Sequence, residues 1–239
     1  MQTESDQELL RIDNLNAWYG ESHILHGMNL SVREGEVITL LGRNGSGRTT
    51  TLKAIMGLVQ RCTGSIKVRG TEVIKMPSHR IAHVGRLGYC PEERGIFASL
   101  NVEENLKLPP MLAEGGMTLE DIYAMFPNLY ERRFSQGSKL SGGEQQMLAI
   151  ARILRTGATL LLLDEITEGL APVILKSLDT VIRQLREKGF TIVLVEQNFR
   201  FAAPLADRHY VIEHGRVIET IDAAELEEKQ EQLNRHLSV

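Results

Sequence analysis

Apolar residues occur along the chain in two patterns that predict two kinds of strand. Three runs are continuously apolar and rich in branched side chains: Val37–Leu41, Thr159–Leu163 and Phe190–Val195. Such runs are typical of buried strands, of the kind found in parallel sheets. Leu25–Val32 and Ser65–Gly70 alternate instead between apolar and polar residues, which predicts half-buried strands. The first third of the chain is therefore expected to be β structure around one buried strand.

Helical spacing of apolar residues predicts the remaining organisation. Residues 49–56 follow the first buried strand and end at Gly57, and residues 174–188 have a helical apolar face. From about residue 101 to 155 the chain is rich in helix formers and is interrupted by Pro109-Pro110. We interpret this region as a helical subdomain inserted into an α/β core. The expected organisation is a flexible tail (1–9), a single domain (10–222) and a charged helical tail (223–239).

Composition and charge narrow the classes of function. The chain has 239 residues, 42% of them hydrophobic, which is enough for one large core without disulfides. The two cysteines, Cys62 and Cys90, match no metal or redox spacing and favour a reducing cytosol. The net charge of −4 gives no reason to expect nucleic acid as a partner. No apolar run approaches the roughly 20 residues of a membrane-spanning helix, and the acidic start does not resemble a signal peptide.

A glycine-rich segment joins the first buried strand to the first helix, and it has the spacing of a phosphate-binding loop. Its glycines permit close backbone approach, and the free amides of the following helix attract an anion. Thr49 offers a hydroxyl to a nucleotide-bound Mg²⁺. The pattern has Arg48 where lysine is usual, and the alternative is a glycine turn without a ligand. The expected phosphate-contacting residues are Gly42, Arg43, Asn44, Gly45, Ser46, Gly47, Arg48, Thr49 and Thr50.

Two further segments carry candidate chemistry. Ser141, followed three residues later by Glu144, forms a capping box for a helix that opens with Gly142-Gly143 and suits a second phosphate contact. An ordinary helix start is the alternative. Asp164-Glu165 ends a buried strand, where open α/β sheets bind ligands. Asp164 is expected to hold Mg²⁺ and Glu165 to act as general base, against the alternative of an acidic turn.

The order of these motifs resembles the ATP-binding subunits of ABC transporters. The phosphate loop at 42–49, Leu140–Gln146 and Leu160–Glu165 carry that resemblance, which covers the chain from about Leu10 to Asp222. The following segments are similar to the subgroup that takes up branched-chain amino acids and related urea or amides: Tyr89–Glu92, Val102–Leu106, Gly143–Ile150, Glu168–Pro172 and Val195–Asn198. The implied fold is an ABC-type nucleotide-binding domain: a mixed β-core with an antiparallel β-subdomain and an inserted helical subdomain.

The resemblance also implies roles for individual residues. Tyr19 would stack on adenine, with a packed strand edge as the alternative. Glu92 would sense Mg²⁺ and the permease, so the implied metal ligands are Thr49, Glu92 and Asp164. Gln197 occupies the switch position, usually histidine, so its contact with the γ-phosphate would be through a neutral amide. Ser141, Gly142 and Gly143 would cap the γ-phosphate held by a second subunit.

The implied assembly pairs this chain with a second ATPase subunit, identical or different, beneath membrane permeases fed by a periplasmic binding protein. The chain would lie at the cytoplasmic face of the inner membrane and hydrolyse ATP to drive import. Two positions depart from the subgroup: Ile166 replaces a proline, and Arg48 replaces the lysine. Because arginine is longer and planar, Arg48 is expected to lower hydrolysis. A nucleotide-binding regulatory subunit and a soluble non-transport ABC ATPase remain alternatives.

Overall fold

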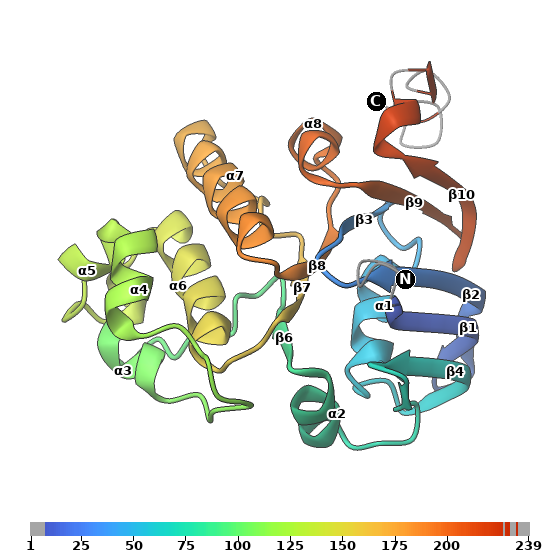
Figure 1. The fold of residues 1–239 in the computed structure, drawn as a ribbon, viewed down its shortest axis with the longest axis horizontal. Helices are drawn as coiled ribbons and strands as arrows, with labels where there is room; N and C mark the ends of the chain where they lie inside the picture. The colour runs from blue at the N-terminus through green and yellow to red at the C-terminus, as the bar shows by residue number, and fades with distance from the viewer. Residues whose placement is uncertain (1–7, 227, 230–232, 234–239) are drawn as a thin grey trace, which may run out of the picture.

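The buried apolar runs form the centre of a six-stranded sheet. The computed structural model describes residues 8–226, 228–229 and 233 (Figure 1). The central strands β3 (Val37–Leu41), β7 (Leu160–Asp164) and β8 (Thr191–Val195) are buried at every position. The strand order is β10-β9-β3-β8-β7-β6, in which only the β9–β10 pair is antiparallel. The outer strands are β6 (Leu87–Cys90), β9 (Arg208–Glu213) and β10 (Arg216–Asp222).

Neighbouring residues of one central strand explain why these runs are continuously apolar. In β7, Leu161 and Leu163 belong to the core formed with α6 (Gly142–Arg155) and α7 (Pro172–Glu187). Leu160 and Leu162 belong to a second core, formed on the other face with α1 (Arg48–Ile55). Successive side chains of a strand point to opposite faces of the sheet. Both faces of this sheet are covered, so no position along β7 favours a polar residue.

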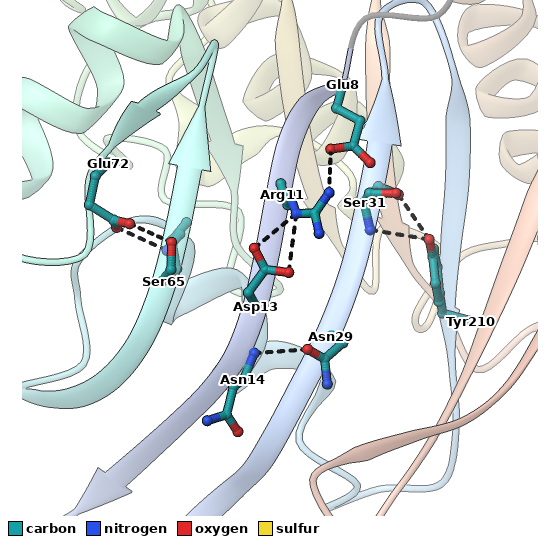
Figure 2. A network of polar contacts seen from close by, with 10 residues as sticks. Glu8, Arg11, Asp13, Asn14, Asn29, Ser31, Ser65, Glu72 and Tyr210 are labelled. Carbon is teal, nitrogen blue, oxygen red and sulfur yellow. Dashed lines mark hydrogen bonds and ion pairs between the residues drawn. The ribbon is translucent and has the colours of Figure 1, made fainter.

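A second, antiparallel sheet has the order β2-β1-β4-β5. Its strands are β1 (Glu8–Tyr19), β2 (Ser22–Arg33), β4 (Arg61–Val68) and β5 (Thr71–Glu72). Figure 2 shows how Tyr210 of β9 ties this sheet to the larger one. The Tyr210 hydroxyl donates to the Ser31 carbonyl oxygen over 2.9 Å and accepts from the Ser31 amide over 3.2 Å.

The helices divide between the two sides of the large sheet. Figure 1 shows α3 to α6 together at one end of the molecule, opposite the antiparallel sheet and α1. Within the described part of the chain, none of the helices combines the length and apolar character needed to cross a membrane. Between residues 8 and 222, the α-helices are α1 (Arg48–Ile55), α2 (Ser78–Gly85), α3 (Val102–Lys107), α4 (Leu119–Met125), α5 (Pro127–Glu131), α6 (Gly142–Arg155), α7 (Pro172–Glu187) and α8 (Phe199–Ala202).

The predicted α/β class is confirmed, including the mixed core and the antiparallel sheet. One boundary is wrong: residues 8 and 9, assigned to the polar tail, belong to β1, and Leu9 is buried. A register shift next to Leu9 lets the adjacent Leu10 be buried as well, so simple alternation does not reveal this strand start. Of the predicted tail at 223–239, a 3₁₀ turn covers Ala223–Glu225. Most of the remainder, like residues 1–7, lies outside the described residues.

Candidate active site

The carboxyl ends of β3, β7 and β8 border a cavity of about 410 Å³. In open α/β sheets this edge is where ligands bind. Most of the residues proposed from the sequence line it: Asn44, Gly45, Ser46, Gly47, Arg48, Thr49, Thr50, Glu92, Glu165 and Gln197. The fold therefore gathers residues that lie more than 150 positions apart into one site.

The loop between β3 and α1 has a backbone that only glycine tolerates at key points. Gly47 precedes α1 with φ 108°, and a Cβ there would lie 2.8 Å from the Leu25 side chain. A Cβ on Gly42 would lie 2.3 Å from the carbonyl oxygen of Ile212. The hydroxyl of Ser46 is buried and has no hydrogen-bond partner among the described residues. A buried, unpaired donor beside free helix amides fits a phosphate group.

Oxygen ligands suited to Mg²⁺ lie next to this loop. The Thr49 hydroxyl donates to Asp164 Oδ1 over 3.1 Å, and the Tyr89 hydroxyl donates to Asp164 Oδ2 over 3.1 Å. Burial raises the pKa of Asp164 to about 6, while these two hydrogen bonds oppose the shift. Carboxylate oxygens of Glu92, Glu165 and Glu168 lie within 4.8 Å of one another. Hydroxyl and carboxylate oxygens form a donor set that a hard divalent cation prefers.

The side chain of Arg48 donates to carboxylate and carbonyl oxygens of the chain itself. Its Nη2 lies 2.8 Å from Glu165 Oε1, and its Nη1 donates to the backbone oxygen of Glu196 over 2.8 Å. Arg48 is only 4% exposed. Burial lowers the pKa of the guanidinium, and the charges of Glu165, Asp164 and Glu196 oppose this effect. The cation thus has a compensating anion on the same chain.

Glu165 is held at both carboxylate oxygens. Arg48 binds Oε1, and Gln197 Nε2 donates to Oε2 over 3.1 Å. The backbone of Glu165 is left-handed, with φ 46°, which is an uncommon conformation for a residue with a side chain. Its amide donates to the Val195 oxygen over 2.9 Å, so β8 fixes the turn. The proposed base therefore has a defined position supported by two strands.

Other predicted residues lie outside this cavity. Among the described residues, Gly42, Arg43, Tyr19, Asp164 and the Ser141–Gly143 turn do not form its lining. Arg43 borders a smaller cavity of about 230 Å³ that is lined by the loop and by the end of β9. Tyr19 is the last residue of β1 and is 46% exposed. The sequence leaves its two interpretations open, and this position is compatible with both.

The Ser141–Gly143 turn starts α6, on the helical side of the molecule. The predicted capping box is confirmed: Glu144 N donates to Ser141 Oγ over 3.3 Å, and Ser141 N donates to Glu144 Oε2 over 2.7 Å. Ser141 borders a separate cavity of about 540 Å³. Gly143 is buried, and a Cβ there would lie 2.8 Å from the Ile174 side chain. Close packing of α6 against α7 is thus one reason for this glycine.

Sequence reasoning missed three residues that shape the site. Glu168 lines the cavity, and the Tyr89 hydroxyl binds Asp164. Glu196 is 1% exposed and accepts from the Thr167 amide over 3.1 Å and from its hydroxyl over 2.6 Å. Burial raises the pKa of Glu196 to about 7. The available signal was their position next to the carboxyl ends of buried strands.

A glycine loop at a helix start, an adjacent Thr49–Asp164 pair and a carboxylate at the end of a central strand define a nucleotide-binding protein of the phosphate-loop class. The family model described as "ABC transporter" matches residues 25–168. The chain belongs to the ABC transporter family and is an ATP-binding subunit of that family.

Two curated relatives and one solved structure illustrate the similarity. The chain is 40% identical to the high-affinity branched-chain amino acid transport ATP-binding protein BraG of Pseudomonas aeruginosa, over 88% of this chain and 91% of that protein. It is 31% identical to the lipopolysaccharide export system ATP-binding protein LptB of Haemophilus influenzae, over 89% and 90% of the two chains. The ATP-binding cassette MJ0796, solved as a dimer with ADP and phosphate, has a TM-score of 0.79 at 24% identity, covering 90% of this chain and 98% of that one. The last likeness concerns the fold alone.

Proposed function

We propose that this subunit hydrolyses ATP to drive import of branched-chain amino acids or related small amides or urea. The observation that carries the proposal is the cavity in which the phosphate loop meets Glu165 and, through Thr49, Asp164. The 40% identity to BraG supports the substrate class, because it extends over nearly the whole of both chains. The chain is also 31% identical to LptB, which is named for lipopolysaccharide export. Transport of a different substrate is therefore the main alternative to this proposal.

The residues of the site have distinct roles in this proposal. The amides from Gly42 to Thr50 and the Ser46 hydroxyl hold the phosphates. Thr49, Asp164 and Glu92 hold Mg²⁺, which supplies charge neutralisation at the phosphates when bound. Glu165 takes a proton from the attacking water, and Gln197 orients Glu165 through its hydrogen bond to Oε2. Tyr19 would stack on the adenine.

The placement of Ser141–Gly143 supports a two-subunit arrangement. This turn lies on a different side of the chain from its own phosphate loop and borders another cavity. We propose that it completes the site of a second ATPase subunit, identical or different, at the cytoplasmic face of the membrane. Permeases and a periplasmic binding protein would supply the transport path and the substrate. The net charge of −4 gives no reason to expect a nucleic acid partner.

The Arg48–Glu165 ion pair favours a second candidate, a regulatory subunit with impaired hydrolysis. In this candidate Arg48 stays paired with the general base during turnover, so that a donor to the developing phosphate charge is lost. Loss of one such donor costs on the order of 10²–10³ in rate. Arg48→Lys is expected to raise steady-state ATPase activity of the chain measured with its partner subunit. Equal turnover of the two proteins would exclude this effect, and single-turnover hydrolysis by the unchanged chain would exclude a purely regulatory role.

A transport measurement tests the substrate class. Cells carrying the chain with its permeases should take up labelled leucine, and Glu165→Gln should abolish uptake while leaving the assembly intact. Uptake that is indifferent to the variant would refute the proposed function. Capture of the purified chain with a permease, and not with nucleic acid, would also exclude the soluble non-transport alternative.

A further inference from the structure

Four side chains close a ring of hydrogen bonds at one end of the nucleotide cavity. Arg48 Nη2 and Gln197 Nε2 donate to the two different oxygens of Glu165, over 2.8 and 3.1 Å. The same two nitrogens donate to Asn44 Oδ1, over 3.3 Å in the case of Arg48. All four residues line the cavity. The ring joins the phosphate loop to the turns after β7 and β8.

The ring contains a nearly fully buried cation, the guanidinium of Arg48, which requires an anion beside it. Arg48 is 4% exposed, so water contributes little to balancing its charge. Glu165 is the residue with which it forms an ion pair, and the side chains of this pair are 3% and 11% exposed. A buried ion whose partner is removed is strongly destabilised unless another charge replaces that partner. Any group that draws Glu165 away must therefore leave an anion beside Arg48.

A phosphate group can supply that anion. Arg48 lies in the first turn of α1, next to the amides that attract phosphate. Its guanidinium is planar and can bind two oxygens of a phosphate, as it can those of a carboxylate. The carboxylate of Glu165 and the terminal phosphate of a bound nucleotide would thus use the same donors, the N–H groups of the Arg48 guanidinium.

We propose that the terminal phosphate of a nucleoside triphosphate competes with Glu165 for Arg48. When that phosphate takes the guanidinium, Glu165 keeps only its Gln197 contact and becomes available to water. A diphosphate is one group shorter, so it leaves the Arg48–Glu165 pair intact. Arg48 then discriminates between the two nucleotides and couples this discrimination to release of the base. This inference rests on the proposed function only in taking ATP as the ligand of the cavity.

Binding affinity tests the competition without any measurement of turnover. The probes are the non-hydrolysable analogue AMP-PNP and ADP, each with Mg²⁺. They are titrated into the full chain by calorimetry at a concentration where light scattering shows a monomer. Glu165→Gln removes the competing charge and should tighten AMP-PNP binding by about tenfold or more, with ADP changed less than about threefold.

Two comparisons isolate the contribution of Arg48. Glu36→Gln is the matched control, because Glu36 also pairs with a largely buried arginine, Arg208, but lies outside the nucleotide cavity. It should change both affinities equally and by less than about threefold. In an Arg48→Gln background, Glu165→Gln should lose its selective gain. If Arg48→Gln fails to fold, Arg48→Met also removes the guanidinium charge and serves in its place.

Three results would overturn the competition: a gain that is equal for AMP-PNP and ADP, a gain matched by Glu36→Gln, or a gain that persists without Arg48. If Glu165→Gln does not fold, Glu165→Asp shortens the side chain and should give the same selective gain. Normal binding of both nucleotides without that selectivity rejects this inference and leaves the transport function standing. Failure of the unchanged chain to bind either nucleotide would reject both.

Discussion

Two helices of this protein begin with a glycine-rich turn, and their surroundings differ sharply. The start of α6 follows local rules: Ser141 caps it, and the acidic Glu144 lies in its first turn, where the helix dipole favours a negative charge. The start of α1 follows neither rule. It has no side-chain cap and no acidic residue in the first turn, and it places Arg48 there.

The difference extends to the ion pair at each helix start. Arg132 and Glu144 form a pair beside α6 in which the arginine side chain is 54% exposed. Arg48 and Glu165 form a pair beside α1 in which both side chains are almost fully buried. A local rule that is broken and then compensated by distant residues is typical of a functional site. The α1 turn therefore depends on contacts with distant residues. The α6 turn is capped by its own residues Ser141 and Glu144, and Ser141 is exposed to solvent.

Replacing the arginine of each ion pair, in two separate variants, should give the largest difference in free energy of unfolding between these turns. Arg48→Met leaves Glu165 and its acidic neighbours uncompensated and should lower the free energy of unfolding by about 3 to 5 kcal/mol. Arg132→Met, the matched control on an exposed pair, should cost less than about 1 kcal/mol. Urea unfolding measures both. Similar losses for the two variants would show that burial does not distinguish the turns.

The pH dependence of stability should distinguish a buried histidine of the large sheet, His209, from an exposed one, His79. His209 of β9 is fully buried beside Thr39 of β3, with Nδ1 2.7 Å from the Thr39 hydroxyl. Burial lowers the pKa of His209 to about 4. Between the ordinary pKa of 6.5 and this value, the unfolded chain binds the extra proton. The histidine therefore destabilises the fold progressively as pH falls from about 6.5 to about 4, and has no such effect at higher pH.

Substitution of His209 measures this contribution. His209→Asn keeps an acceptor for the Thr39 hydroxyl and should remove about 3 kcal/mol of the stability lost between those pH values. Urea unfolding at a series of pH values gives the slope. His79→Asn, at an exposed position of α2, is the control for the exchange of histidine for asparagine. A profile of His209→Asn that parallels the unchanged protein would contradict the prediction.

The smallest effect is expected at the α6 turn. Gly143→Ala places a Cβ about 2.8 Å from Ile174 and should cost about 1 to 2 kcal/mol by overpacking. Ile174→Ala in the same chain should relieve this clash, so the double variant is more stable than the sum of the single effects predicts. Thermal or urea unfolding of the four proteins completes the cycle. Simple additivity would mean that Gly143 is not constrained by α7.

Several features of the fold could be predicted because they depend on neighbours in sequence. The continuous apolar runs gave β3, β7 and β8 within one or two residues, and the Ser141–Glu144 spacing gave the α6 cap. The strand start at Glu8 was missed because a register shift breaks the alternation. Glu196 was missed as a structural residue because its hydrogen bonds go to Thr167, 29 positions away.

The sequence by itself determined the family of the chain, the central strands and the loop that faces a phosphate, since periodicity and glycine spacing act over a few residues. The tertiary structure alone decided what Arg48 does. Its partners lie 117 and 148 positions away, at the ends of two other strands. A buried charge must take whichever anion the fold brings within reach, and no local pattern encodes that choice. The sequence shows that lysine is replaced, and the fold shows that the replacement binds the general base.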